Sequence, residues 1–301
     1  MEINPKVIAV YWTFNPDIKI LSLSLKKLIN YVDEVIIVDN ASRNIDQLRE
    51  LILKISNKDI RIIELKRNLD VKALNIGISE AIKKRADWVL LMDDDSIYPG
   101  STLRKIMIAN NILCRHRNDL CYKIAIISLP TWMYKESKST FIIYNYAWQF
   151  SGSLVKTDIV KKHGTFIPEN FFVDLADVFF YSMVRKIGYI TIHYTRDKML
   201  HKSGRIILLP RLLKPWKKRA WRYYVPWRYY MHVRNSMITL RQGLWDPYNA
   251  LRTIFLIGIV LIIMYGFKSW IKAFTTGVAH GLFGRLGYLD PKLFRHEDNL
   301  R

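Results

Sequence analysis

Short apolar runs alternate with segments of helical periodicity through the amino-terminal part of the chain. Unbroken runs of about four to eight apolar residues predict strands, and apolar residues at every third or fourth position predict helices. Strands are expected at 7–11, 34–39, 60–65, 88–92 and 190–194, and helices at 21–28, 47–55 and 68–84. Strand–helix alternation with short connections predicts an α/β fold, a mainly parallel sheet with helices on both faces.

The apolar run 88–92 leads directly into three carboxylates, Asp93, Asp94 and Asp95. In open α/β sheets, ligands bind beyond the carboxyl ends of the strands. Adjacent carboxylates repel one another, and a shared Mg²⁺ or Mn²⁺ relieves that repulsion. Asp93 and Asp95 are two residues apart, so one turn can direct both at the same ion. The alternative is a solvated acidic turn that holds no metal.

Composition adds a strong positive charge to this picture. The 301 residues carry 47 Lys and Arg against 26 Asp and Glu, a formal charge of +21, and half of them are hydrophobic. Such a chain can bury a large core and favours polyanions: nucleic acid, anionic lipid or phosphorylated substrates.

Two cysteines, Cys114 and Cys121, are expected to be ordinary thiols. The polar start lacks the apolar core of a signal peptide, so the amino-terminal half is expected in the cytoplasm.

A family resemblance rests on the order of these motifs. An Asn15-Pro16 loop, a strand ending in 38–42 (Val-Asp-Asn-Ala-Ser), an asparagine-containing helix start and a strand ending in an aspartate cluster resemble glycosyltransferase family 2. Within that family, the chain is most similar to the rhamnosyltransferase and galactofuranosyltransferase branch. The resemblance implies a GT-A fold and sugar transfer with inversion from a UDP- or dTDP-linked donor, with Mn²⁺ or Mg²⁺. One departure is that Asn68 is not followed by the family's Asn-x-Gly glycine.

The resemblance also implies roles for individual residues. The residues expected to bind the donor are Thr13, Asn15, Asp39, Asn68, Asn75, Asp93, Asp94 and Arg234. Those expected to hold the metal are Asp93, Asp95 and His201, and those expected to line the acceptor pocket are Trp148, Ser151 and Gly152. Asp177 matches the catalytic base, with Asp174 one helical turn earlier as the other candidate. The residues alone fit a second interpretation equally well, in which both acids stabilise a helix start and Arg234 braces its helix.

The carboxyl-terminal third has a different composition. Residues 198–245 contain no acid but many Lys, Arg and aromatic residues, a pattern typical of nucleic-acid binding or of a lipid-headgroup belt. Residues 253–267 are almost wholly apolar and would span roughly 22 Å as a helix, whereas a bilayer core needs about 20 residues. We expect this segment to lie in the membrane interface; a short transmembrane helix and a buried core helix are the alternatives.

These observations predict a catalytic GT-A domain at 1–205 and a basic, aromatic, helical region at 206–301. The expected protein works at the cytoplasmic face of the cell membrane, on a lipid-linked or glycan acceptor. Its partners would include an anionic membrane surface but no nucleic acid, and an oligomer is compatible with the sequence. The alternatives are a sugar nucleotidyltransferase, which should carry a glycine- and basic-rich loop after the first strand, and a basic nucleic-acid-binding protein, which would not explain the strand-end acids.

Overall fold

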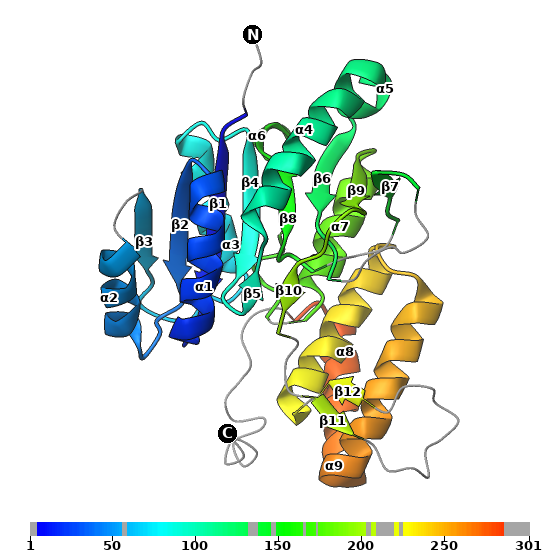
Figure 1. Cartoon of the computed structure of the whole chain (residues 1–301). Coiled ribbons are helices and arrows are strands. Elements are labelled where there is room, and N and C mark those ends of the chain that lie inside the picture. The colour runs from blue at the N-terminus through cyan, green and yellow to red at the C-terminus, as the bar shows by residue number, and fades with distance from the viewer. Residues whose placement is uncertain are drawn as a thin grey trace. The chain divides into compact units, whose positions relative to one another are not determined.

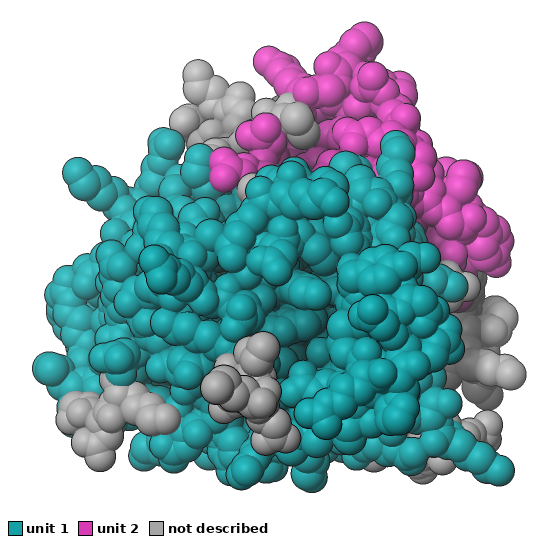
Figure 2. All heavy atoms as spheres, turned by 90° about the horizontal axis from the view of Figure 1, so that it is seen from above, with its two compact units in different colours: residues 1–168, 180–201 teal, residues 169–179, 202–301 magenta. Residues whose placement is uncertain are grey.

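The computed structural model describes residues 5–55, 59–131, 138–145, 149–164, 167–172, 174–202, 206–208, 220–222 and 225–285. The chain divides into two compact units, which Figure 2 colours separately. Unit 1 comprises residues 1–168 and 180–201, and unit 2 comprises residues 169–179 and 202–301. The domain boundary expected at residue 205 stays a prediction.

Within its described residues, unit 1 is built on an eight-stranded sheet with the strand order β3-β2-β1-β4-β8-β6-β9-β7 (Figure 1). The first four strands are parallel, and β6 is parallel to β9. Strand β8 is antiparallel to both β4 and β6, and β7 is antiparallel to β9. The strands are β1 (Val7–Thr13), β2 (Glu34–Asp39), β3 (Ile60–Glu64), β4 (Trp88–Asp93), β6 (Ile124–Ser128), β7 (Phe141–Ile143), β8 (Ser153–Lys156) and β9 (Ile190–Tyr194).

Helices cover both faces of this sheet, as predicted. They are α1 (Ile18–Leu28), a 3₁₀ turn η1 (Ile29–Tyr31), α2 (Ile45–Ile55), α3 (Lys72–Lys83), α4 (Gly100–His116), α5 (Asn118–Cys121), α6 (Thr157–His163) and α7 (Ala176–Lys186). Helix α3 begins four residues later than expected, because residues 68–71 form a turn in which Asp70 has a positive φ of 48°.

The alternation of side chains along the strands decides which helix packs where. One set of strand residues, including Ala9, Tyr11 and Leu90, shares a core with helices α1, α2 and α4. The alternate residues face α3, where Gly77 lies so close to β1 that a Cβ atom would stand 2.2 Å from Cγ1 of Val10. The small residue at this position therefore permits close packing of helix on sheet.

The cysteine prediction was wrong. Cys114 lies in the last turns of α4, and Cys121 lies at the end of α5; the two form a disulfide with a Cα–Cα distance of 4.8 Å. The break between the two helices at Arg117 folds the chain back and brings the two side chains together. Sequence spacing alone does not reveal such a reversal, so the pairing could not be expected from it.

Two helices form most of the described part of unit 2: α8 (Pro226–Arg241) and α9 (Pro247–Leu282). A short antiparallel pair, β11 (Ile206–Leu208) and β12 (Ala220–Arg222), completes it. Helix α9 is interrupted at Gly266, which has φ 80° and ψ 165°. Trp270, after this break, donates a hydrogen bond to the Tyr229 hydroxyl, which in turn donates to the carbonyl of Ile254. A straight helix would separate residues 254 and 270 by about 24 Å, so the two halves of α9 form a hairpin.

The hairpin packs on α8 around a core that includes Tyr229, Tyr230, Val233, Leu261 and Ala273. This finding corrects the interpretation of the basic, aromatic segment. Tyr229 and Tyr230 were expected to contribute to a headgroup belt or a nucleic-acid surface, but both are buried among the helices. Of the other aromatics expected in this belt, Trp227 is partly buried against the same core, and Trp221 lies in β12. Those at positions 216, 223 and 224 lie outside the described residues.

Candidate active site

The carboxyl ends of β1, β2 and β4 meet at one edge of the unit 1 sheet, because these three strands are neighbours and parallel. Thr13 pairs with Asp39 in the sheet register, and its hydroxyl donates a 2.8 Å hydrogen bond to the Asp39 carboxylate. Asp39 also accepts from the backbone N–H and the hydroxyl of Ser42. Both Thr13 and Asp39 are 1% exposed, so this contact organises the strand ends from within the protein.

The loops next to these strand ends are held by asparagines. Asn15 has a positive φ of 51°, and its side-chain oxygen accepts from the backbone N–H of Arg43. Asn68 caps the turn before α3 by accepting from the N–H of Asp70. Asn75 is buried in α3 and donates to the carbonyl of Ile167. Donor binding by these asparagines stays a prediction, since the contacts seen here are with the protein's own backbone.

The acidic cluster lies at the end of β4. Asp93 is the last residue of that strand; its backbone N–H donates to Ser151, and its carboxylate accepts from the indole N–H of Trp12. Asp94 accepts from the backbone N–H of Phe14. Burial, with smaller contributions from the neighbouring acids, raises the pKa of Asp94 to about 7.

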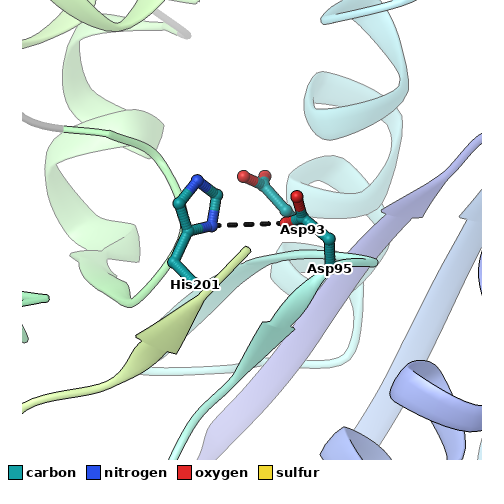
Figure 3. Close-up of side chains that lie close together, drawn as sticks. All are labelled: Asp93, Asp95 and His201. Carbon is teal, nitrogen blue, oxygen red and sulfur yellow. Dashed lines mark ion pairs between the residues drawn. The ribbon is translucent and has the colours of Figure 1, made fainter. Parts of the chain in front are cut away.

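His201 joins this cluster from a distant part of the sequence. A two-stranded ribbon pairs β10 (Leu200–His201) with β5 (Ser96–Ile97) and sets His201 opposite Ser96. Nδ1 of His201 lies 2.7 Å from the Ser96 hydroxyl and 3.2 Å from Oδ1 of Asp95. Figure 3 shows the imidazole facing Asp93 and Asp95.

The geometry fits a divalent metal ion. Potential ligand atoms of Asp93, Asp95 and His201 lie within 4.8 Å of one another, and each residue is partly buried. Carboxylate oxygens with one imidazole nitrogen suit Mn²⁺. If Nδ1 carries the proton and donates it to the Ser96 hydroxyl, this contact orients the ring and makes Nε2 the candidate ligand, a common arrangement around metal-binding histidines. The structure thus brings together the three residues that were expected to hold the metal.

The residues expected to line the acceptor pocket have structural contacts beside β4. Ser151 is fully buried, and its hydroxyl accepts from the backbone of Asp93. Gly152 has a positive φ of 80°, and a Cβ atom there would stand 2.2 Å from Sδ of Met199. The positive φ favours glycine at this position. Trp148 lies outside the described residues.

The two candidate bases belong to unit 2 and differ in their surroundings. Asp174 is 9% exposed and forms an ion pair with Arg228, whose Nη2 lies 3.0 Å from its Oδ1. Asp177 is partly buried in the first turn of α7, where its carboxylate accepts from the N–H of Val178. The structure therefore ties Asp174 to α8 and sets Asp177 at a helix start.

Arg234 is 1% exposed and lies within the helical packing of unit 2. Its Nε donates to the side-chain oxygen of Asn235, and its guanidinium stands 5.8 Å from the ring centre of Tyr230. These contacts match the bracing interpretation; binding of the donor diphosphate by Arg234 stays a prediction.

Several residues without a predicted role contact the predicted site residues, among them Trp12, Ser96, Arg228 and Asn235. Trp12 and Ser96 are adjacent to predicted residues, and their side-chain direction became clear only from the strand register. Arg228 and Asn235 lie more than 50 residues from Asp174, and no spacing rule connects them.

The chain is similar to known proteins in both sequence and structure. Residues 7–151 match the model of glycosyl transferase family 2. The dTDP-rhamnosyl transferase RfbF of Shigella flexneri is 26% identical over 257 residues, which cover 80% of this chain and 81% of that protein.

Two solved structures illustrate the likeness in fold. The mannosyltransferase PcManGT from Pyrobaculum calidifontis, in complex with GDP-Man and Mn²⁺, has a TM-score of 0.54 at 15% identity, over 94% of this chain and 89% of its own. S. aureus TarS also has a TM-score of 0.54 at 15% identity, over 91% of this chain and 49% of its own. These likenesses confirm the predicted GT-A type of sheet.

Proposed function

We propose that the chain is a glycosyltransferase of family 2, whose model matches residues 7–151, and that it is an inverting, metal-dependent enzyme acting at a membrane. It would transfer a sugar from a nucleotide-sugar donor to a hydroxyl of a lipid-linked or glycan acceptor. The observation that supports metal dependence is the cluster of Asp93, Asp95 and His201 beyond the end of β4. The family assignment decides against the sugar nucleotidyltransferase alternative.

The proposed reaction divides its tasks among residues already described. Asp93, Asp95 and His201 would hold Mn²⁺ or Mg²⁺, which supplies positive charge for the leaving diphosphate. Asp177 would accept the proton of the acceptor hydroxyl while that oxygen forms its bond to the anomeric carbon. The bond from the anomeric carbon to the diphosphate breaks in the same displacement, so the anomeric centre inverts.

The relatives suggest which donor to test first. The Shigella relative is named for dTDP-rhamnose, and PcManGT was solved with GDP-Man and Mn²⁺. We propose dTDP- or UDP-linked sugars for this chain, with dTDP-rhamnose as the first candidate. Thr13, Asn15, Asp39, Asn68 and Asn75 would shape the nucleotide site from the strand ends and loops.

A panel of nucleotide sugars tests this proposal through release of nucleoside diphosphate, with Mn²⁺, with Mg²⁺ and with chelator. Release from one donor that stops on chelation is expected, and Asp95→Ala should lower it by more than about 100-fold while the protein stays folded. Release that continues unchanged in chelator would contradict the metal assignment. Transfer with retention of anomeric configuration would contradict the single displacement.

Exposed apolar residues on α9 support action at a membrane. Large side chains stand exposed at helical spacing along the first half of this helix and at its break: Tyr248, Leu251, Phe255, Ile263, Met264 and Phe267. Residues 247–282 contain no acid, and Arg252, Lys268 and Lys272 are exposed among them. Apolar side chains with interspersed cations are typical of helices that lie in a membrane interface.

The break at Gly266 favours an interfacial hairpin over a span. By length and composition α9 could cross a membrane. About a third of its most apolar 18-residue stretch is buried within the protein. Between Arg252 and Gly266, however, the apolar part covers only about 20 Å, against a bilayer core of about 30 Å. We therefore propose that the hairpin enters one leaflet, on the cytoplasmic face of the cell membrane.

A further inference from the structure

The short segment before α7 contains a strained residue. Leu175 has a positive φ of 69° and is buried, with 8% of its surface exposed. A leucine disfavours this left-handed conformation, because its Cβ approaches the following carbonyl oxygen and its side chain makes no compensating local hydrogen bond. Such a conformation persists only where the surroundings fix it. Ala176 and Asp177 follow directly in the first turn of α7.

Asn235 on α8 holds the peptide next to this strained residue. Its side-chain nitrogen donates a 2.7 Å hydrogen bond to the backbone carbonyl of Asp174, and Asn235 is fully buried. That carbonyl belongs to the peptide unit joining Asp174 to Leu175. Fixing the plane of this peptide restricts rotation at the φ angle of Leu175, and hence the direction in which α7 begins.

The side chain of Asp174 provides a second attachment to α8. Nη2 of Arg228 lies 3.0 Å from Oδ1 of Asp174, and Nε lies 3.3 Å from the same oxygen. His232 is also near, with Nδ1 3.9 Å from Oδ2, but burial lowers its pKa and favours the neutral ring. Asp174 is thus held by its backbone through Asn235 and by its side chain through Arg228.

We propose that Asn235 and Arg228 are positioning residues: with Asp174 they form a latch that holds Leu175 in its left-handed conformation and so aims Asp177. The proposal rests on the role of Asp177 as base given above. It assigns Asp174 a structural task rather than proton transfer. It also gives Asn235, the residue after Arg234 on α8, a function within unit 2 that is separate from binding of the donor diphosphate. No contact with substrate is required of Asn235 or Arg228.

The test compares Asn235→Ala with Ser236→Ala in the full-length protein. Ser236 is a matched control, because it is also fully buried on α8 but its hydroxyl donates to the carbonyl of His232 in its own helix, with no hydrogen bond to another element in the described part of the chain. Hydrogen exchange should become faster in Asn235→Ala at the start of α7, where the N–H of Phe179 donates to the carbonyl of Leu175. Unchanged exchange there, or equal changes in both variants, would overturn the latch.

Turnover gives a second measurement, made with the nucleotide sugar that the donor panel selects. Asn235→Ala should lower kcat by about 10- to 100-fold with the donor KM unchanged, as expected for a misplaced catalytic group. Arg228→Lys, which keeps the charge, should retain more turnover than Arg228→Met. If the donor KM of Asn235→Ala rises by as large a factor as its kcat falls, Asn235 has a direct role in donor binding and the positioning role is overturned.

A substitution that removes the strain separates the latch from a general loss of stability. Glycine adopts a positive φ without the Cβ penalty, so Asn235→Ala should cost less kcat in a Leu175→Gly background than in the wild type. Equal costs in both backgrounds would overturn the link through Leu175. Asp177→Asn tests the base on its own: if it is inactive while Asn235→Ala is fully active, the latch fails and the base assignment stands. If Asp177→Asn is fully active, the base assignment fails and Asn235 has nothing to position.

Discussion

The imidazole of His201 contacts a neighbouring hydroxyl that can fix its orientation. Ser96 lies 2.7 Å from Nδ1, and a hydrogen bond donated by Nδ1 would make the opposite nitrogen, Nε2, the ligand of the proposed metal ion. Ser96→Ala should therefore weaken Mn²⁺ binding by about 10- to 100-fold, the usual effect of losing such a partner. Titration with Mn²⁺ followed by electron paramagnetic resonance measures this directly. Wild-type affinity in the variant would mean that His201 is not a ligand or is oriented by other groups.

The two aspartates at the start of α7 should respond differently to loss of charge. Asp177→Asn should cut turnover by roughly 10²–10⁴-fold while donor binding is retained, because the amide cannot accept the acceptor's proton. Asp174→Asn keeps the backbone bond to Asn235 and loses the ion pair with Arg228, so a smaller loss is expected. Steady-state kinetics of both variants decides the matter. Full activity in Asp177→Asn with loss in Asp174→Asn would move the base to Asp174.

His193 predicts a pH dependence of folding. It is fully buried in β9 against the ring of Tyr144, and burial lowers its pKa to about 3. Between pH 6.5 and 3 the unfolded chain therefore binds a proton at this site that the folded protein does not. Stability must fall as the pH drops through this window, by up to about 1.4 kcal/mol per pH unit.

His193→Gln removes this contribution and leaves the other titrating groups in place. Between pH 6.5 and 5, the free energy of unfolding should fall by up to about 2 kcal/mol less in His193→Gln than in the wild type. Urea denaturation at the two pH values measures the difference. An identical decrease in both proteins would show that His193 accepts its proton in the folded state.

At the level of single residues, the sequence predicted the metal cluster better than its supports. The acids Asp93 and Asp95 follow a recognisable apolar strand, and the resemblance supplied His201 although it lies more than 100 residues away. The contacts of Trp12 and Arg228 could not be predicted, since they arise from side-chain directions set by strand register and helix packing. Polar residues with no motif of their own give no sequence signal for such contacts.

Among the elements, continuous apolar runs were the reliable signal. Strands β1, β2 and β4 were predicted because each is buried on both faces and reads as an unbroken hydrophobic stretch. Strand β6 was not predicted although it is a fully buried apolar run as well. Strands β7 and β8 were not predicted either: they are short, and their antiparallel insertion into the sheet depends on partners distant in sequence. The break in α9 was missed because a single glycine in an apolar segment is compatible with a continuous helix.

That break makes a prediction about unit 2. Gly266 has φ 80° and ψ 165°, a combination that is essentially restricted to glycine. Gly266→Ala should lower the free energy of unfolding by about 1–3 kcal/mol, because the hairpin must strain or open. Thr275→Ala, an exposed change in the second half of α9, should stay within about 0.5 kcal/mol. Thermal unfolding measures both, and equal stabilities would mean that the hairpin tolerates another backbone conformation.

For the molecule as a whole, the net charge and the apolar surface of α9 support one functional prediction. Each Lys or Arg near an anionic membrane contributes about 1 kcal/mol, and buried apolar side chains add to this. Removing α9 would be an ambiguous test, since its two halves share a core with α8. Point substitutions on the exposed face leave that core intact and test membrane binding alone.

We expect the full-length protein to float with vesicles that contain anionic lipid at low salt. Leu251→Ser with Phe255→Ser should weaken this binding and leave donor hydrolysis unchanged, because both side chains are exposed on α9. Leu53→Ser with Ile108→Ser removes comparably exposed apolar side chains from unit 1 and should not affect flotation. Binding should also weaken as salt is raised, since screening reduces the cationic contribution. If the wild-type protein stays in the soluble fraction, the exposed face of α9 does not bind membranes, and the proposed location at the cytoplasmic face fails.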